Sequence, residues 1–83
     1  MKLIEKNRKQ KEDAELLQDY LESGNLEVLG ELYNRYIHLV YGVCLKYFKN
    51  REDSKDAVNK IFENLITEIT KFNIENFRSW LYV

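Results

Sequence analysis

A set of polar side chains recurs at helical spacing in the second half of the chain. Each member has another three or four residues away: Asp53, Asp56, Asn59, Lys60 and Glu63. A helix would present them on one face. Phe62 lies in the same segment, and an aromatic side chain ringed by polar groups is typical of the centre of a protein interface. A solvated helix face gives the same pattern, so periodicity leaves both interpretations open.

Aromatic residues gather near the end of the chain: Phe72, Phe77, Trp80 and Tyr82. Amide and guanidinium side chains stand between them. Aromatic rings on a loop or at a helix start can stack on unpaired nucleobases, at roughly 1 to 3 kcal/mol per base. Packing of these rings in a core is the other interpretation of the pattern.

The sequence offers little for catalysis. His38 and Cys44 are the only residues of their types, and neither has a carboxylate or a second ligand at a suitable spacing. Metal sites and nucleophilic sites need several convergent groups. No glycine-rich phosphate loop is present. We therefore expect no catalytic residue, no metal site, no cofactor and no small-molecule substrate.

The elements that must position these residues are all predicted to be helices. We expect a first helix over residues 13–23, with Asp13 as its N-cap and Gly24 as its stop. Asn25 would cap one long second helix that continues to Phe48. This helix carries two neighbouring apolar stripes, so we expect it to be central and covered on more than one side.

A third helix is predicted to begin at the cap Asp53 and to run to about Lys71. Residues 72–76 break the periodicity, and Asn76 would cap a last helix. The result is an all-α fold, a small bundle of three to four helices.

Composition restricts the class of protein. The chain has 83 residues and a net charge of −1, so it has room for one core and lacks the basic excess of a dedicated duplex binder. The charge is segregated, since residues 1–11 are basic and residues 12–35 are acidic. We expect a basic arm over residues 1–12. With one cysteine and no long apolar run, we expect no membrane span and a cytoplasmic location.

Four motifs occur in an order that resembles a known family. They are Ser23-Gly24-Asn25, the segment Leu32-Tyr33-Asn34-Arg35-Tyr36, residues 52–62 and residues 77–82. Together they resemble region 2 of the extracytoplasmic-function (ECF) sigma factors of the sigma-70 superfamily, which are bacterial initiation subunits of RNA polymerase. The resemblance spans about residues 13–83. It implies a truncated protein, because the family's helix-turn-helix domain, region 4, does not follow.

The resemblance implies two partners. The third helix would dock on the clamp helices of the largest subunit of core RNA polymerase, through Asp53, Asp56, Asn59, Lys60, Phe62 and Glu63. Asn59 stands where the family usually has glutamine, and Lys60 stands where an acidic residue is common. The family also binds an anti-sigma factor in some members, and the sequence leaves that partner open.

The second partner implied is the non-template strand of the promoter's minus-ten element, which the domain would recognise and melt. The residues implicated are Lys71, Phe72, Asn73, Ile74, Glu75, Asn76, Arg78, Ser79, Trp80 and Tyr82. A different class of function stays open beside this one: a small helical protein–protein interaction domain that binds no nucleic acid and could form a dimer. In that case the aromatic residues would all be core.

Overall fold

The computed structural model describes residues 11–82, and within this range it contains helices, turns and loops but no strand. The α-helices are α2 (Asp13–Ser23), α3 (Leu26–Asn34), α4 (Ile37–Phe48), α5 (Arg51–Glu68) and α6 (Phe77–Tyr82), with a short 3₁₀ helix, η1 (Ile69–Lys71), after α5. The all-α prediction is confirmed. Of the predicted basic arm, residues 1–10 lie outside the described residues.

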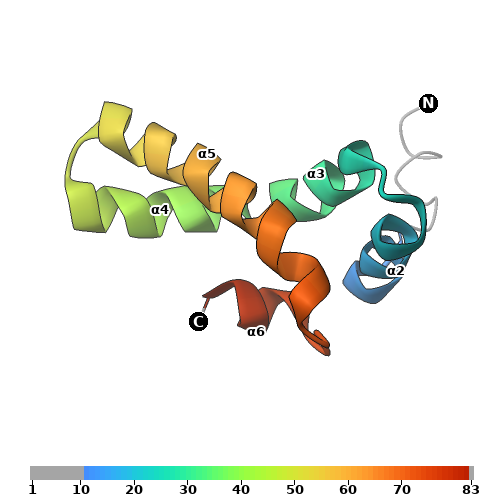
Figure 1. Ribbon diagram of the computed structural model, residues 1–83. Coiled ribbons are helices and arrows are strands. Elements are labelled where there is room, and N and C mark those ends of the chain that lie inside the picture. Colours follow the sequence, from blue (N-terminus) through green and yellow to red (C-terminus); the bar gives the residue numbers. More distant parts are fainter. Residues whose placement is uncertain (1–10, 83) are drawn as a thin grey trace, which may run out of the picture.

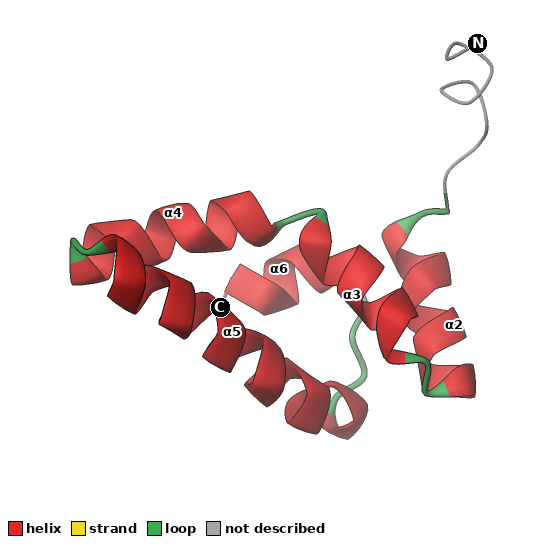
Figure 2. Ribbon diagram, turned by 90° about the horizontal axis from the view of Figure 1, so that it is seen from above, coloured by secondary structure: helices red, strands yellow, loops and turns green. Residues whose placement is uncertain are grey.

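The helices form two pairs and a short closing helix (Figure 1). Helices α4 and α5 make a hairpin whose turn lies at one end of the molecule, and α2 packs on α3 at the other end. Seen from above, α4 and α5 diverge away from their turn, and α6 lies in the view between them (Figure 2). Helix α6 contacts α2, so the loop before α6 returns the end of the chain to its first helix.

One apolar core holds these elements together. Leu29 and Leu32 of α3 have no exposed surface, and neither does Ile69 of η1. Full burial of a side chain of this size contributes about 1.5 to 3 kcal/mol. The other buried apolar residues are Leu16, Leu17, Tyr20, Tyr33, Val40, Cys44, Val58, Leu65 and Phe77. Because every helix contributes at least one of them, the position of each helix depends on the same core.

A hydrogen bond inside this core ties α3 to α5. The hydroxyl of Tyr33 donates to the carbonyl oxygen of Val58 at 3.0 Å. Burial raises the pKa of Tyr33 to about 12, so the hydroxyl keeps its proton and its role as a donor at neutral pH. Among the described residues, no buried side-chain nitrogen or oxygen lacks a hydrogen-bond partner.

The prediction of one long helix over residues 25–48 is wrong, because the chain bends at Arg35 and Tyr36. The amide of Arg35 bonds the carbonyl of Leu32 at 3.2 Å, and the amide of Tyr36 bonds that of Tyr33 at 2.9 Å. These are tight i to i−3 bonds, which end α3 and let α4 start in a new direction. The side chains of Arg35 and Tyr36 both bind Asp13, so a tertiary contact fixes the bend.

The expectation that this helix is covered on more than one side is also wrong for α4. Its residues Val40 and Cys44 are buried, but Val43 is 54% exposed and Tyr47 is 82% exposed. Among the described residues, α5 packs on one side of α4, whereas His38, Gly42 and Lys46 on the opposite side are exposed. A small domain has too few elements to enclose a helix on all sides.

Two helix starts differ from the prediction. Helix α2 is capped by Glu12, which forms a capping box with Glu15, and not by Asp13. Helix α5 is capped by Asn50, whose side-chain oxygen accepts from the amide of Asp53 at 3.0 Å. Both aspartates therefore lie in the first turn, where a negative charge interacts favourably with the helix dipole. Their carboxylates are left available for other contacts.

The predicted boundary between the first two helices is confirmed. Gly24 has φ +71°, the left-handed conformation that favours glycine after a helix. The side chain of Asn25 caps α3 by accepting from the amide of Glu27 at 2.9 Å.

Candidate protein and nucleic-acid interfaces

The outward face of α5 carries the polar residues that the spacing placed together. All five are exposed: Asp53, Asp56, Asn59, Lys60 and Glu63. The opposite side of α5 buries Ser54, Val58 and Leu65 in the core. Among the described residues, none of the five forms a salt bridge. We call these five residues the α5 face, and their exposure makes their side chains accessible to a partner.

Phe62 does not stand at the centre of that face. It is half-buried, and its ring centroid lies 5.0 Å from that of Tyr33, with the planes tilted by 37°. Since Tyr33 is 4% exposed, Phe62 packs at the margin of the core and offers a partner only part of its ring. The sequence placed Phe62 on this helix but did not predict its inward contact.

Between η1 and α6 lies a loop, residues 72–76, that presents side chains to solvent. Phe72 is 54% exposed, and Asn73 and Glu75 are exposed as well. Ile74 is half-buried and packs against the core, which anchors the middle of the loop. Just before the loop, Lys71 pairs with Glu68 at 3.3 Å, an exposed contact that leaves the ammonium group accessible.

The predicted cap of the last helix is confirmed. The side-chain oxygen of Asn76 accepts from the amide of Ser79 at 3.0 Å. Arg78 and Ser79 are exposed on the first turn of α6. Tyr82 ends the helix, and its side chain lies outside the part of the chain that the structure describes.

The aromatic residues form a connected series. Phe72 and Trp80 have centroids 6.1 Å apart, and Trp80 and Phe77 lie 6.3 Å apart. Phe77 is 3% exposed, and its centroid lies 6.0 Å from that of Tyr36 at the bend between α3 and α4. Such tilted contacts are favoured geometries for aromatic pairs. The inner rings therefore belong to the core and the outermost ring, Phe72, faces solvent.

A cavity of about 450 Å³ lies between this loop and α2. Phe72, Asn73 and Phe77 line it on one side, and Asp13, Leu17 and Gln18 line it on the other. The α2 residues were not predicted as part of any site, because some sixty positions separate them from the loop and no local pattern links the two segments. The cavity has both apolar and hydrogen-bonding walls.

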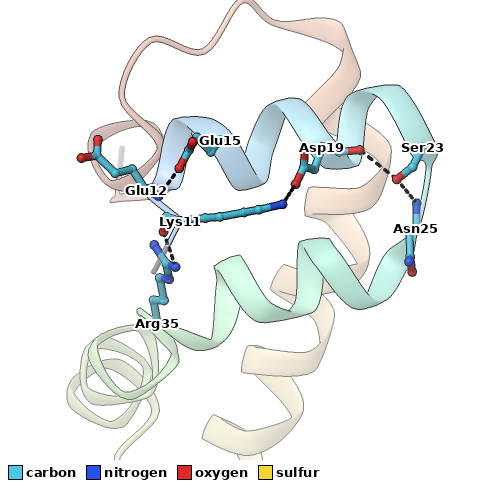
Figure 3. A network of polar contacts seen from close by, with 7 residues as sticks. All are labelled: Lys11, Glu12, Glu15, Asp19, Ser23, Asn25 and Arg35. Carbon is cyan, nitrogen blue, oxygen red and sulfur yellow. Dashed lines mark hydrogen bonds and ion pairs between the residues drawn. The ribbon is translucent and has the colours of Figure 1, made fainter. Parts of the chain in front are cut away.

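Polar contacts fix the α2 wall (Figure 3). Lys11 pairs with Asp19 at 2.5 Å, and this hydrogen bond raises the pKa of Lys11. The guanidinium group of Arg35 donates to the carbonyl oxygen of Lys11 at 2.5 Å. At the other end of α2, the hydroxyl of Ser23 donates to the carbonyl oxygen of Asp19. The start of α2 is thus joined to the bend after α3.

Among the side chains that the structure describes, no group of three or more His, Cys, Asp or Glu is arranged to hold a metal ion. None of the helices within residues 11–82 combines the length and the apolar character that crossing a membrane requires.

Comparison with known families identifies the class of protein to which this helical domain belongs. The family model for sigma-70 region 2 matches residues 32–83, more than half of the chain. The chain therefore belongs to the sigma-70 region 2 family, a transcription-initiation family and not a family of enzymes. Membership implies the role of sigma region 2, which is to bind RNA polymerase and recognise a promoter. No curated protein and no solved structure matched the chain.

The inward position of Phe62 has a consequence for stability. We expect Phe62→Ala to lower the free energy of unfolding by about 2 kcal/mol, since it removes a half-buried ring and its contact with Tyr33. Asn59→Ala, one turn away and exposed, should change it by less than about 0.5 kcal/mol. Urea denaturation of the two variants measures the difference. Equal unfolding midpoints would show that Phe62 is not packed as described.

Proposed function

We propose that this chain is the region 2 domain of a bacterial ECF sigma factor, with the domain spanning residues 13–83 after a basic arm. It docks on core RNA polymerase through α5 and holds the non-template strand of the minus-ten element at the loop before α6. Since it would act on RNA polymerase, its place is the bacterial cytoplasm. An anti-sigma factor would be a further partner that blocks one of these surfaces.

The proposed polymerase site is the α5 face together with the exposed part of Phe62. Its partner is the coiled coil of clamp helices in the largest subunit. Three acidic side chains on this face, Asp53, Asp56 and Glu63, are free of ion pairs among the described residues. They can therefore accept charge-assisted hydrogen bonds from basic side chains of the partner. Lys60 gives the same face one donor of its own.

The observation that carries the DNA proposal is the cavity beside the exposed ring of Phe72. An extruded base can stack on an aromatic ring, or enter a pocket where its edge forms hydrogen bonds. The amide groups of Asn73 and Gln18 are hydrogen-bonding groups on the cavity wall. Unstacking a base costs a few kcal/mol, so a site that holds the extruded base shifts the duplex toward the open state. Promoter melting then needs binding and no covalent chemistry.

The charges around the cavity favour a base over a phosphate. Its wall includes the carboxylates of Glu12, Asp13 and Glu75. Glu12 and Glu75 are exposed, so they repel phosphate groups and can accept hydrogen bonds from the amino groups of bases, whereas both oxygens of Asp13 are already held by Arg35 and Tyr36. The cations, Lys71 and Arg78, lie at the flanks of the loop, where they can contact the sugar–phosphate backbone of the strand. The full proposed set is Lys71, Phe72, Asn73, Ile74, Glu75, Asn76, Arg78, Ser79, Trp80 and Tyr82.

The polymerase contact is tested by binding of the full chain to an isolated clamp coiled coil. We expect Asp56→Ala and Glu63→Ala each to weaken this binding by more than about 1 kcal/mol, the loss that is typical of residues that contribute strongly to an interface. Isothermal titration calorimetry measures the affinities. Glu31→Ala is the matched control, because Glu31 is an exposed acidic residue on another helix, α3.

If Glu31→Ala lowers the affinity for the clamp coiled coil as much as Asp56→Ala and Glu63→Ala do, then binding depends on the net charge of the chain and not on the α5 face. Absence of binding by the unsubstituted chain would contradict the polymerase role directly.

The DNA contact is tested with Phe72→Ala and a labelled single-stranded oligonucleotide pool that covers minus-ten sequences. We expect the affinity to fall about tenfold, since one stacked base is worth roughly 1 to 3 kcal/mol. Fluorescence anisotropy measures it. Tyr47→Ala removes another exposed aromatic ring from the far end of α4 and should leave the affinity unchanged. Equal affinities of the two variants would refute the proposed role of Phe72 in holding the strand.

A further inference from the structure

We propose that Tyr36 is a positioning residue, which sets the spacing between the two walls of the cavity beside the loop at residues 72–76. The inference rests on the proposed function, because it assigns a purpose to that cavity. It concerns a residue that does not line the cavity and would not touch DNA. Tyr36 acts through two residues that do line it, Asp13 and Phe77.

The first contact of Tyr36 reaches the α2 wall. Its hydroxyl donates to Oδ2 of Asp13, and Oδ1 of the same carboxylate accepts from Nη1 of Arg35 at 2.8 Å. Both carboxylate oxygens are therefore held by consecutive residues of the bend. The hydrogen bond to Asp13 raises the pKa of Tyr36, so the hydroxyl stays protonated at neutral pH. Hydrogen bonds to a charged acceptor are stronger than those between neutral groups.

The second contact reaches the loop wall. The ring of Tyr36 lies 6.0 Å from that of Phe77, the first residue of α6. Phe77 in turn contacts Trp80, and Trp80 contacts the exposed ring of Phe72. A shift of Phe77 would therefore move the ring on which a base is proposed to stack. Tyr36 is the residue in contact with both walls, one through its hydroxyl and the other through its ring.

The matched segment, residues 32–83, contains Tyr36 and Phe77 but not Asp13. The partner that fixes the hydroxyl thus lies on α2, before the matched segment. Asp13 also gives a reason for the bend after α3, since a straight helix would carry Arg35 and Tyr36 in different directions.

Tyr36→Phe is the direct test, because it removes the hydroxyl and keeps the ring on Phe77. Trp80 is the only tryptophan of the chain, so its fluorescence reports on α6 alone. In the free protein we expect stronger iodide quenching of Trp80. We also expect about a tenfold loss of affinity for the single-stranded oligonucleotide pool, in line with the lower end of the range for a hydrogen bond to a charged group. Affinity for the clamp coiled coil, which uses α5, should not change.

Tyr47→Phe is the matched control, since it makes the same change at a tyrosine that is 82% exposed. Asp13→Ala is a second variant that breaks the same contact from the other side. If the hydroxyl and the carboxylate act as one unit, the double variant should lose no more affinity for the strand than the stronger single variant.

The outcomes separate this inference from the proposed function. If Tyr36→Phe shows the same iodide quenching of Trp80 and the same strand affinity as the wild-type chain, the positioning role is overturned and the proposed function is unaffected. Equal losses of strand and clamp affinity would also overturn it, since Tyr36 would then only hold the fold. If the unsubstituted chain binds no strand, the proposed DNA role fails, and iodide quenching of Trp80 alone decides whether Tyr36 positions α6.

Discussion

Burial of the apolar side of α3 is the constraint on which the other elements depend. Leu29 and Leu32 have no contact with solvent, and the hydroxyl of Tyr33 reaches the backbone of α5. Helices α2 and α4 both contact α3, and α5 contacts it through Val58 and Phe62, which meet Tyr33. Because a chain of this length has only one core, a shift of α3 would also move every surface proposed to meet a partner.

The two proposed interfaces are joined through α5 and the turn after it. The α5 face lies on the helix itself, and η1 follows without a break, anchored by the fully buried Ile69. The loop at residues 72–76 begins directly after η1. Docking of α5 on a polymerase would therefore fix where this loop lies relative to the DNA. Through this rigid connection, the protein–protein contact would position the loop for binding the strand.

Local signals in the sequence predict most of the helical structure. The stop at Gly24, the caps Asn25 and Asn76 and the exposed polar side of α5 all follow from residue types and spacing within a few positions. The bend at Arg35 and Tyr36 could not be predicted in this way. The apolar stripe continues across it, and the cause is a carboxylate more than twenty positions earlier in the chain.

The candidate site also has a part that local sequence signals predict and a part that depends on tertiary contacts. Sequence spacing placed the aromatic residues of the loop together, but the α2 wall of the cavity and the inward contact of Phe62 arise only from tertiary packing. Amphipathic helices and aromatic clusters serve many functions, so the residue pattern alone does not define a role. The roles proposed for these residues therefore come from the family resemblance. Physical geometry then distinguished rings that belong to the core from the one that faces solvent.

The central claim is that one small domain binds the polymerase clamp and a single DNA strand on separate surfaces. Trp80 fluorescence tests it directly: the full chain is first saturated with the clamp coiled coil and then titrated with the single-stranded oligonucleotide pool. We expect the clamp to leave Trp80 emission unchanged and the strand then to quench it, with an affinity close to that for the free chain. Competition between the two ligands, or strand binding that does not alter Trp80 emission, would contradict the central claim.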